Sequence, residues 1–320
     1  AFIEWLKVLN EKHPIDKKIG FYGLDVYSFN ESMNSIIQFL EKNDLKALAF
    51  AKTVQKCFEP YNKDEGRSYA KASSYIPEIC EKEIIDLLTE IQKNIPNYNH
   101  DAENVLSIEQ NAFIARNAEK YYRAMLKRSS ASWNIRDEHM VSTIARLMKF
   151  HGKNAKIIVW EHNTHIGDAR ATEMANTGML NVGQLLREQH SSDGVVALGF
   201  GSYKGSVIAG REWGDSMRKI KVPEAVQGSW EHSFHVAGNG KNKLLLMNKV
   251  KDEKCLLSYI AHRAIGVVYN PEHERFGNYV PSILPKRYDA FIFLDETNAL
   301  HPMLICPDGN QIPETYPFGM

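Results

Sequence analysis

Residues 155–171 read AKIIVWEHNTHIGDARA and carry the strongest structural and chemical signal in the chain. The residues from Lys156 to Trp160 are mostly β-branched or aromatic, which predicts a buried strand. Glu161, His162 and His165 follow that strand directly. In open α/β sheets, ligands bind beyond the carboxyl ends of the strands, so titratable groups at this point indicate a functional site. The simpler alternative is that one histidine caps the strand and the other faces water.

A second carboxylate follows another predicted strand near the start of the chain. Residues 18–24 read KIGFYGL, a short apolar run, and Asp25 comes directly after it. Asp25 is a candidate to orient a histidine or to hold a substrate hydroxyl, and the alternative is a turn carboxylate or a helix cap. Tyr27 is a candidate substrate-binding residue, with simple packing as the alternative.

Strands and helices broadly alternate along the chain, and this order predicts the fold class. Helices are expected at 2–12, 30–42, 79–95, 102–126, 135–150, 185–189 and 229–234, and further strands at 194–200, 206–209, 243–247, 265–269 and 290–294. We therefore expect an α/β fold with a central, mainly parallel or mixed sheet, flanking helices and a helical insertion. Residues 1–43 and 133–320 would form the α/β core, and residues 44–132 a helical insertion or lid region.

The totals exclude some classes of function. The 320 residues contain 39 Lys and Arg and 39 Asp and Glu, so the formal net charge is zero and no bulk basic field exists to attract nucleic acid. No apolar run approaches the roughly 20 residues of a membrane span. The four cysteines, at 57, 80, 255 and 306, lack the spacing of a zinc site. Buried thiols are the simplest interpretation, and a bridge between Cys57 and Cys80 stays open.

The chain opens with AFIEWLK, which already has the apolar spacing of an amphipathic helix. No initiator methionine and no capping residue precede this helix, so we expect further sequence upstream. The compartment is therefore unknown from the sequence, with the cytoplasm as the default, because an export signal would lie in that upstream part.

His162 and His165 could also suggest a metal pair. A metalloprotease helix, however, has the pattern His-Glu-x-x-His, whereas here Glu161 precedes both histidines and a strand leads into them. Because imidazole titrates near neutral pH, a metal-free role as general base or as donor to an oxyanion fits better. We expect no cofactor, and a metal-dependent hydrolase remains the alternative.

Two further segments hold polar residues that sequence alone leaves open. Arg136 and Asp137 lie in the predicted helix that follows Ser132, where they suit either a site or a solvated pair at the helix start. Asn181 and Gln184 lie in a loop before a short helix, and this loop lacks the glycines of a phosphate cradle. No G-x-S-x-G nucleophile elbow occurs in the sequence, which argues against a serine hydrolase of that type.

An ordered set of short motifs resembles the erythromycin esterase family, including its bacterial members labelled succinoglycan biosynthesis proteins. The motifs span the whole chain and are Gly23–Asp25, Tyr121–Arg123, Ser132–Asp137 with Met140, Trp160–Ile166, Leu180–Gln184, Gly205–Val207, Ile265–Tyr269 and Tyr288–Phe291 with Asp295–Thr297. Each motif is weak alone, and the ordered set is specific. The family pattern also has an earlier block with a Gly-Glu-x-x-His segment, which this sequence does not contain.

The resemblance implies a metal-independent hydrolase, in which a histidine of that earlier block activates water to attack an ester or macrolide lactone. It also implies that His162 and His165 match the family's His-Asn-x-His segment, with His162 the stronger candidate for a direct role. Supporting catalytic roles are expected for Asp25 and Arg136, and substrate-binding roles for Glu161, Asn163, Tyr27, Asn181 and Gln184. Glu161 stands where many relatives carry a small residue. The alternative function is a non-catalytic carbohydrate- or ligand-binding protein that retains the cleft.

Overall fold

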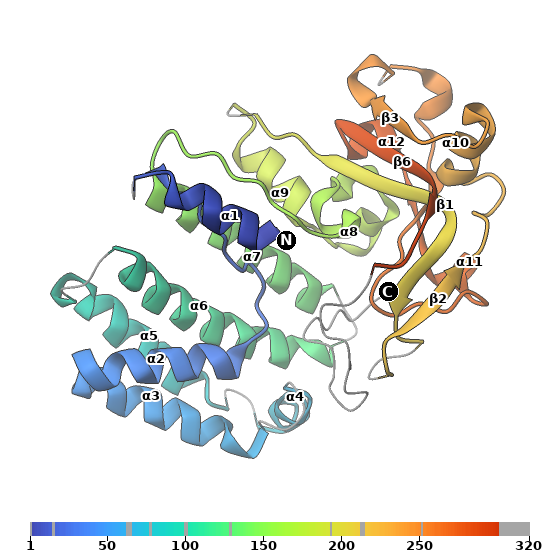
Figure 1. Cartoon of the computed structure of the whole chain (residues 1–320). Helices are drawn as coiled ribbons and strands as arrows, with labels where there is room; N and C mark the ends of the chain where they lie inside the picture. The colour runs from blue at the N-terminus through green and yellow to red at the C-terminus, as the bar shows by residue number, and fades with distance from the viewer. Residues whose placement is uncertain are drawn as a thin grey trace.

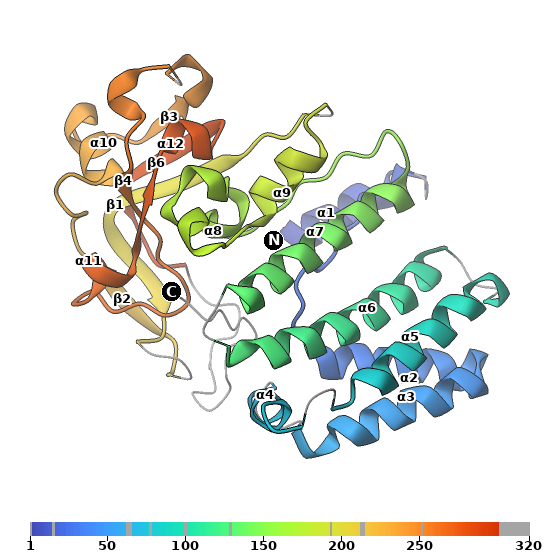
Figure 2. The ribbon, with the colours of Figure 1, turned by 180° about the vertical axis from the view of Figure 1, so that it is seen from behind.

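The protein divides into a helical part and a part that contains the sheet, as a computed structural model shows (Figures 1 and 2). The structure describes residues 2–14, 17–61, 66–76, 79–98, 102–127, 130–192, 194–211, 215–250 and 252–300. The helices α2 to α6 lie on one side and the main sheet on the other. The helix α7 (Ala131–His151) lies between them, so it connects the two parts.

The helical part is built from α2 (Phe29–Asn43), α3 (Leu45–Phe58), α4 (Arg67–Ser73), α5 (Glu81–Asn94) and α6 (Ala102–Met125). Met33, Ile36 and Leu40 are spaced three and four residues apart on α2 and are buried, because this spacing places them on one helix face. The helix α2 packs against α3 and α6, and α5 packs against the same two helices. These helices share one hydrophobic core, so α2, which we expected in the α/β core, packs within the helical part.

The remaining helices lie beside α7 or in the part that contains the sheet. They are α1 (Phe2–Glu11), α8 (Asn163–Ile166), α9 (Val182–Gln189), α10 (Trp230–Gly238), α11 (Glu274–Gly277) and α12 (Leu284–Arg287). Single 3-10 turns occur at Glu59–Tyr61, Ile95–Asn97, Ala169–Ala171, Glu173–Thr177, Met247–Lys249 and Lys254–Leu256. The helix α7 packs on α6 on one side and on α9 on the other.

The main sheet has four strands in the order β2-β1-β6-β3. They are β1 (Leu198–Ala209), β2 (Arg218–Val222), β3 (Lys243–Leu246) and β6 (Ala290–Thr297). β1 and β6 pair in parallel, with Leu198 opposite Ala290, whereas β2 and β3 pair antiparallel to their neighbours. A separate antiparallel pair joins β4 (Ile260–Arg263) to β5 (Tyr279–Ser282). The predicted α/β fold with a mixed sheet and flanking helices is confirmed.

Three predicted strands are not formed. Residues 18–24, 156–160 and 265–269 belong to no strand. The segment 156–160 instead leaves Ile158 94% and Trp160 90% exposed. Residues with high strand propensity favour an extended backbone, but a strand also needs a neighbour for its hydrogen bonds. Among the described residues these segments form no ladder, although Val268 makes one isolated bridge to Gly210, so these strand predictions were wrong.

The break expected between the strands at 194–200 and 206–209 is also wrong, because β1 continues through residues 201–205. The glycines there serve close packing in the sheet. Gly205 has a φ of 145°, and a Cβ at this position would lie 2.0 Å from the carbonyl oxygen of Thr297 on β6. Side chains at Gly199 and Gly201 would meet the Phe291 ring. The glycines of this segment therefore serve close contacts between β1 and β6.

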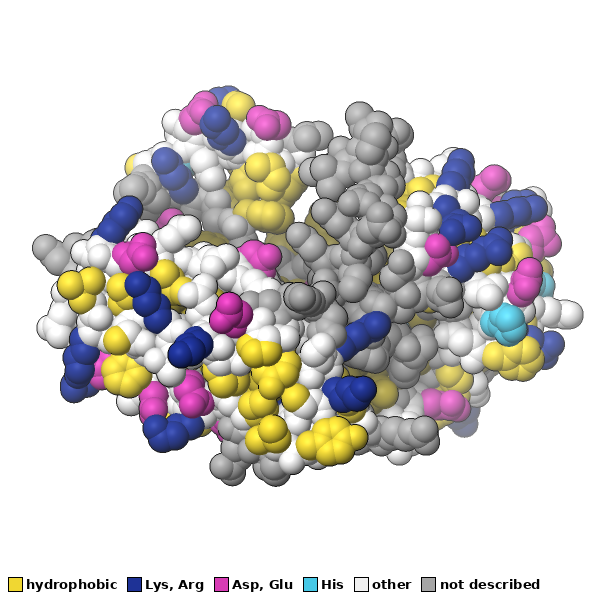
Figure 3. Space-filling view, turned by 90° about the horizontal axis from the view of Figure 1, so that it is seen from below, with side chains coloured by type: hydrophobic (Ala, Val, Ile, Leu, Met, Phe, Trp, Pro, Cys, Tyr) yellow, Lys and Arg dark blue, Asp and Glu magenta, His cyan; other side chains and the backbone are white. Residues whose placement is uncertain are grey.

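The surface shows no dominant sign of charge in the view from below (Figure 3). Lys and Arg side chains are interspersed with Asp and Glu over both parts of the molecule. Within the ranges that the structure describes, no helix is long and apolar enough to cross a membrane.

One disulfide closes a loop in the helical part. Cys57, at the end of α3, is bonded to Cys80, which precedes α5, and their Cα atoms are 5.8 Å apart. Of the two interpretations left open by the sequence, the bridge is therefore the one observed. Cys255 is exposed and has a free thiol. Cys306 lies outside the described residues.

Loss of this disulfide should lower the free energy of unfolding by about 3 kcal/mol, because the bridge restricts a 23-residue loop in the unfolded chain. The measurement is urea unfolding of the wild type and of the double variant Cys57→Ser, Cys80→Ser. The control is Cys255→Ser, which should unfold as the wild type does. An unchanged midpoint in the double variant would contradict the stabilising role of the bridge.

Candidate functional site

Asp137, in the second turn of α7, is the centre of the polar cluster. Its side chain is fully buried, and its carboxylate accepts hydrogen bonds from the ring of His165 and from the backbone N–H of Val182. The distances from His165 Nδ1 to the two oxygens are 3.0 and 3.1 Å, and the distance from Val182 N is 3.0 Å. Burial raises the pKa of Asp137, and the hydrogen bonds from His165 and Val182 oppose this effect.

The ring of His165 is held in one orientation. Trp133 stacks on it, with ring centroids 4.5 Å apart and planes 6° from parallel. Because Nδ1 donates to Asp137, the neutral ring carries its lone pair on Nε2. No described residue forms a hydrogen bond with Nε2. The arrangement is that of an imidazole oriented by a carboxylate, with its second nitrogen available as a base.

Asp25 and Arg136 form a two-pronged ion pair beside this cluster. Arg136 Nη2 lies 2.7 Å from Asp25 Oδ2, and Nε lies 3.0 Å from Oδ1. Burial disfavours the charge of Arg136, but the hydrogen bonds and charge of Asp25 outweigh burial and raise the pKa of the guanidinium. The guanidinium also lies 5.0 Å from the centre of the Tyr27 ring, whose hydroxyl is 3.0 Å from that of Tyr121.

Glu161 is the carboxyl group of the site that has no hydrogen-bond partner among the described residues. Both of its oxygens are buried. Burial and the nearby charges of Asp137 and Asp25 raise its pKa from 4.5 to about 8, and Arg136 opposes them. The Glu161 carboxyl group therefore keeps its proton at neutral pH.

Both ring nitrogens of His162 are engaged. Nε2 donates to the carbonyl oxygen of Ile265 at 2.9 Å, and Nδ1 accepts from the backbone N–H and the hydroxyl of Thr164. His162 thereby caps the short helix α8. Desolvation lowers the pKa of His162 to about 4, although the residue is exposed. The hydrogen bonds also fit a neutral ring, because Nε2 donates and Nδ1 accepts. No ring nitrogen is left for a proton transfer unless one of these contacts breaks.

The three predicted amide-bearing residues hold the backbone around the site. Asn163 bonds both the N–H and the carbonyl of Phe200 at the start of β1. Asn181 is fully buried and uses all its side-chain capacity on four backbone groups of residues 164–184. Gln184 donates to Glu188 on the same helix, α9. These contacts organise the loops, and Asn181 has no polar atom left for a substrate.

The structure thus brings Asp25, Arg136, Tyr27, Glu161 and His165 together from segments far apart in the sequence. It adds Trp133, which the sequence offers only as part of a motif. It also gives a definite role to Asp137, which by sequence suits either a site or a solvated pair at the helix start. The sequence signal for both residues was their place in the Ser132–Asp137 motif. Asp137, the last residue of that motif, is fully buried in the structure.

The described part of the chain holds no group of three or more His, Cys, Asp or Glu side chains placed to bind a metal ion.

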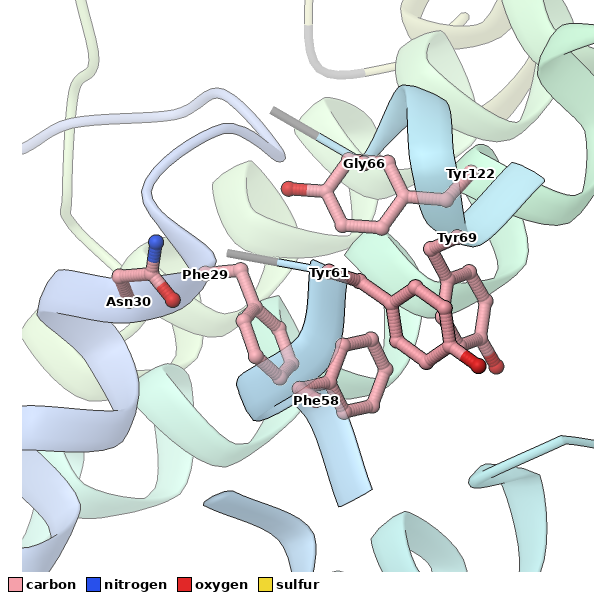
Figure 4. A pocket seen from close by; sticks show the side chains of 7 residues that line it. All are labelled: Phe29, Asn30, Phe58, Tyr61, Gly66, Tyr69 and Tyr122. Carbon is pink, nitrogen blue, oxygen red and sulfur yellow. The ribbon is translucent and has the colours of Figure 1, made fainter. Parts of the chain in front are cut away.

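A small pocket lies in the helical part (Figure 4). It is lined by Phe29, Asn30, Phe58, Tyr61, Gly66, Tyr69 and Tyr122. Its walls are mainly aromatic rings, and Tyr122 packs against Tyr121, the hydroxyl partner of Tyr27. Through Tyr121 and Tyr27, the aromatic cluster is therefore in contact with the polar site.

Comparison with known proteins identifies relatives. A family model described as erythromycin esterase matches residues 1–297. A crystal structure of a Bacillus cereus protein is 17% identical, with a TM-score of 0.75 over 92% of this chain and 71% of that chain. A succinoglycan biosynthesis protein is 17% identical, with a TM-score of 0.70 over 93% of this chain and 70% of its own. A mutant of the erythromycin esterase EreC, in its open conformation, is 13% identical, with a TM-score of 0.61 over 92% and 72%. At sequence identities this low, the TM-scores show a shared fold alone.

Glu161→Gln should make the protein more stable at alkaline pH. The folded state holds a proton on Glu161 up to about pH 8, whereas the unfolded chain releases it near pH 4.5. Stability therefore falls between these values as pH rises, by up to about 1.4 kcal/mol per pH unit. The free energy of unfolding of the variant should exceed that of the wild type by roughly 2–4 kcal/mol at pH 8.

The measurement is urea unfolding at several values from pH 5 to pH 9, where the difference should shrink toward the acid end. Glu138→Gln is the matched control, because Glu138 is exposed on α7. A difference between Glu161→Gln and the wild type that does not change with pH would contradict the buried, protonated state.

Proposed function

The chain belongs to the erythromycin esterase family, and on this premise we propose that it is an esterase-like hydrolase in which His165 activates water, the role that the resemblance gives to a histidine of the earlier block. The observation that carries the proposal is the hydrogen bond from His165 Nδ1 to buried Asp137 at 3.0 Å, with Nε2 left without a partner among the described residues. Water is a poor nucleophile until a base near neutral pKa removes its proton. His165 Nε2 takes that proton, and the water oxygen attacks the carbonyl carbon.

Asp137 gives this step its geometry and its electrostatic support. It fixes the tautomer of His165 and stabilises the imidazolium that forms when Nε2 gains a proton. The stacking of Trp133 on the ring restricts its rotation. Arg136 supplies positive charge beside the cluster for the oxyanion of the tetrahedral intermediate, and Asp25 holds its guanidinium in place. No step of this scheme requires a metal ion.

We infer that the substrate is a small-molecule ester, and that a macrolide lactone is the specific candidate, with macrolide resistance as its consequence. The family description and the name of the EreC relative support this substrate class. Family membership does not fix the substrate, because one fold hosts many chemistries. The aromatic rings of Tyr27 and Trp133 beside the polar cluster suit a substrate with a large apolar body.

His165→Ala should lower kcat for ester hydrolysis by about 10²–10⁴-fold, because it removes the general base. The measurement is steady-state hydrolysis of erythromycin and of a panel of simple esters at pH 7.5. His235→Ala is the matched control. His235 also pairs with a carboxylate, Asp295 at 2.6 Å, and stacks on an aromatic ring, Tyr203, but it lies on α10 outside the site. Equal rates for His165→Ala and the wild type would refute the assignment.

The variant His162→Ala distinguishes the role of His162 from that of His165. Because His162 caps α8 and holds Ile265, its loss should lower the melting temperature and reduce kcat less than the loss of His165. A larger loss of kcat in folded His162→Ala than in His165→Ala would assign the direct role to His162. Binding of esters by the wild type without turnover would instead favour a ligand-binding protein.

A further inference from the structure

Three carboxyl groups meet at the site, and their surroundings differ. Asp25 is bonded to Arg136 in two places, and Asp137 is bonded to His165 and to the N–H of Val182. Glu161 has neither kind of support, although both of its oxygens are buried. Among the described residues it is thus the carboxyl group of the cluster that no donor neutralises.

The charges that face Glu161 come from two other segments of the chain. Asp25 follows the segment 18–24, and Asp137 and Arg136 lie on α7. The only cation among them, Arg136, already makes its closest contact with Asp25 at 2.7 Å. A third negative charge here would be repelled by two carboxylates and would lack a hydrogen bond, so Glu161 is held in its neutral acid form.

We propose that Glu161 is the group that donates a proton to the leaving alkoxide when the ester bond breaks, an assignment that rests on the proposed hydrolase function. Its place in the chain supports this role. It lies between exposed Trp160 and the cap of α8, four residues before His165. Its carboxyl group therefore lies in the same cluster as Asp137, the hydrogen-bond partner of the base.

The two residues divide the proton transfers. His165 Nε2 removes a proton from water while the water oxygen bonds to the carbonyl carbon. The tetrahedral intermediate then collapses, the bond from carbon to the ester oxygen breaks, and that oxygen leaves with the electron pair. Glu161 gives its proton to this oxygen, which yields the alcohol. The proton held on His165 returns to Glu161 through solvent, so the net reaction consumes one water and forms an acid and an alcohol.

The dependence on the leaving group tests this role. An alkyl alkoxide is strongly basic and needs a proton as it departs, whereas nitrophenolate leaves without one. Glu161→Gln should therefore lower kcat for an alkyl ester by about 10²–10⁴-fold and leave kcat for the 4-nitrophenyl ester of the same acid within a few-fold of the wild type. Turnover of the nitrophenyl ester also shows that the variant is folded. Glu138→Gln should match the wild type on both esters.

The wild type alone gives a second measurement. Below about pH 8 its rates should depend only weakly on the pKa of the leaving alcohol, and above that pH the dependence should steepen as Glu161 loses its proton. Equal loss on both esters in Glu161→Gln, no loss on either, or a leaving-group dependence that does not change with pH would overturn the role of Glu161 and leave the hydrolase function standing. A wild type that hydrolyses neither ester would overturn the proposed function, and this assignment with it.

Discussion

A single buried carboxylate, that of Asp137, joins three helices of this molecule. From α7 it accepts a hydrogen bond from His165 on α8 and another from the first residue of α9, Val182. A carboxylate without exposure to water is costly unless donors surround it, so the positions of α8 and α9 are tied to the position of this one side chain. The same bonds determine which nitrogen of His165 carries the proton. The packing of α7, α8 and α9 and the tautomer of His165 therefore depend on the same carboxylate.

The parts of the fold that follow from local periodicity could be predicted, and the parts that depend on distant partners could not. The apolar spacing in α2, α6 and α7 was enough to place those helices to within a few residues. The segment 156–160 has equally strong strand propensity, yet it belongs to no strand, because propensity does not supply the neighbouring chain that a ladder requires. Gly205 shows the converse, because this glycine lies at the expected break between two strands, yet it allows close contact with Thr297 within one continuous strand.

The candidate site divides in the same way. His165, Asp25 and Arg136 could be singled out from residue type and position, and the structure brings all three together. Asp137 could not, because an acid in the first turns of a helix is common and its burial depends on α8 and α9. The unusual state of Glu161 also lies beyond sequence reasoning. It arises from charges that are more than twenty residues away along the chain, and only folding brings them near.

The parallel pairing of β1 with β6 has a consequence for how the chain assembles as it leaves the ribosome. Leu198 pairs opposite Ala290, and Arg287, just before β6, donates to the carbonyl of Asn163 at the start of α8. The helices α2 to α6 emerge long before either contact can form, and domains fold as units during synthesis. A nascent chain that stops short of β6 therefore already contains all of the residues of the helical core, whereas its histidine segment still lacks the last of its supports.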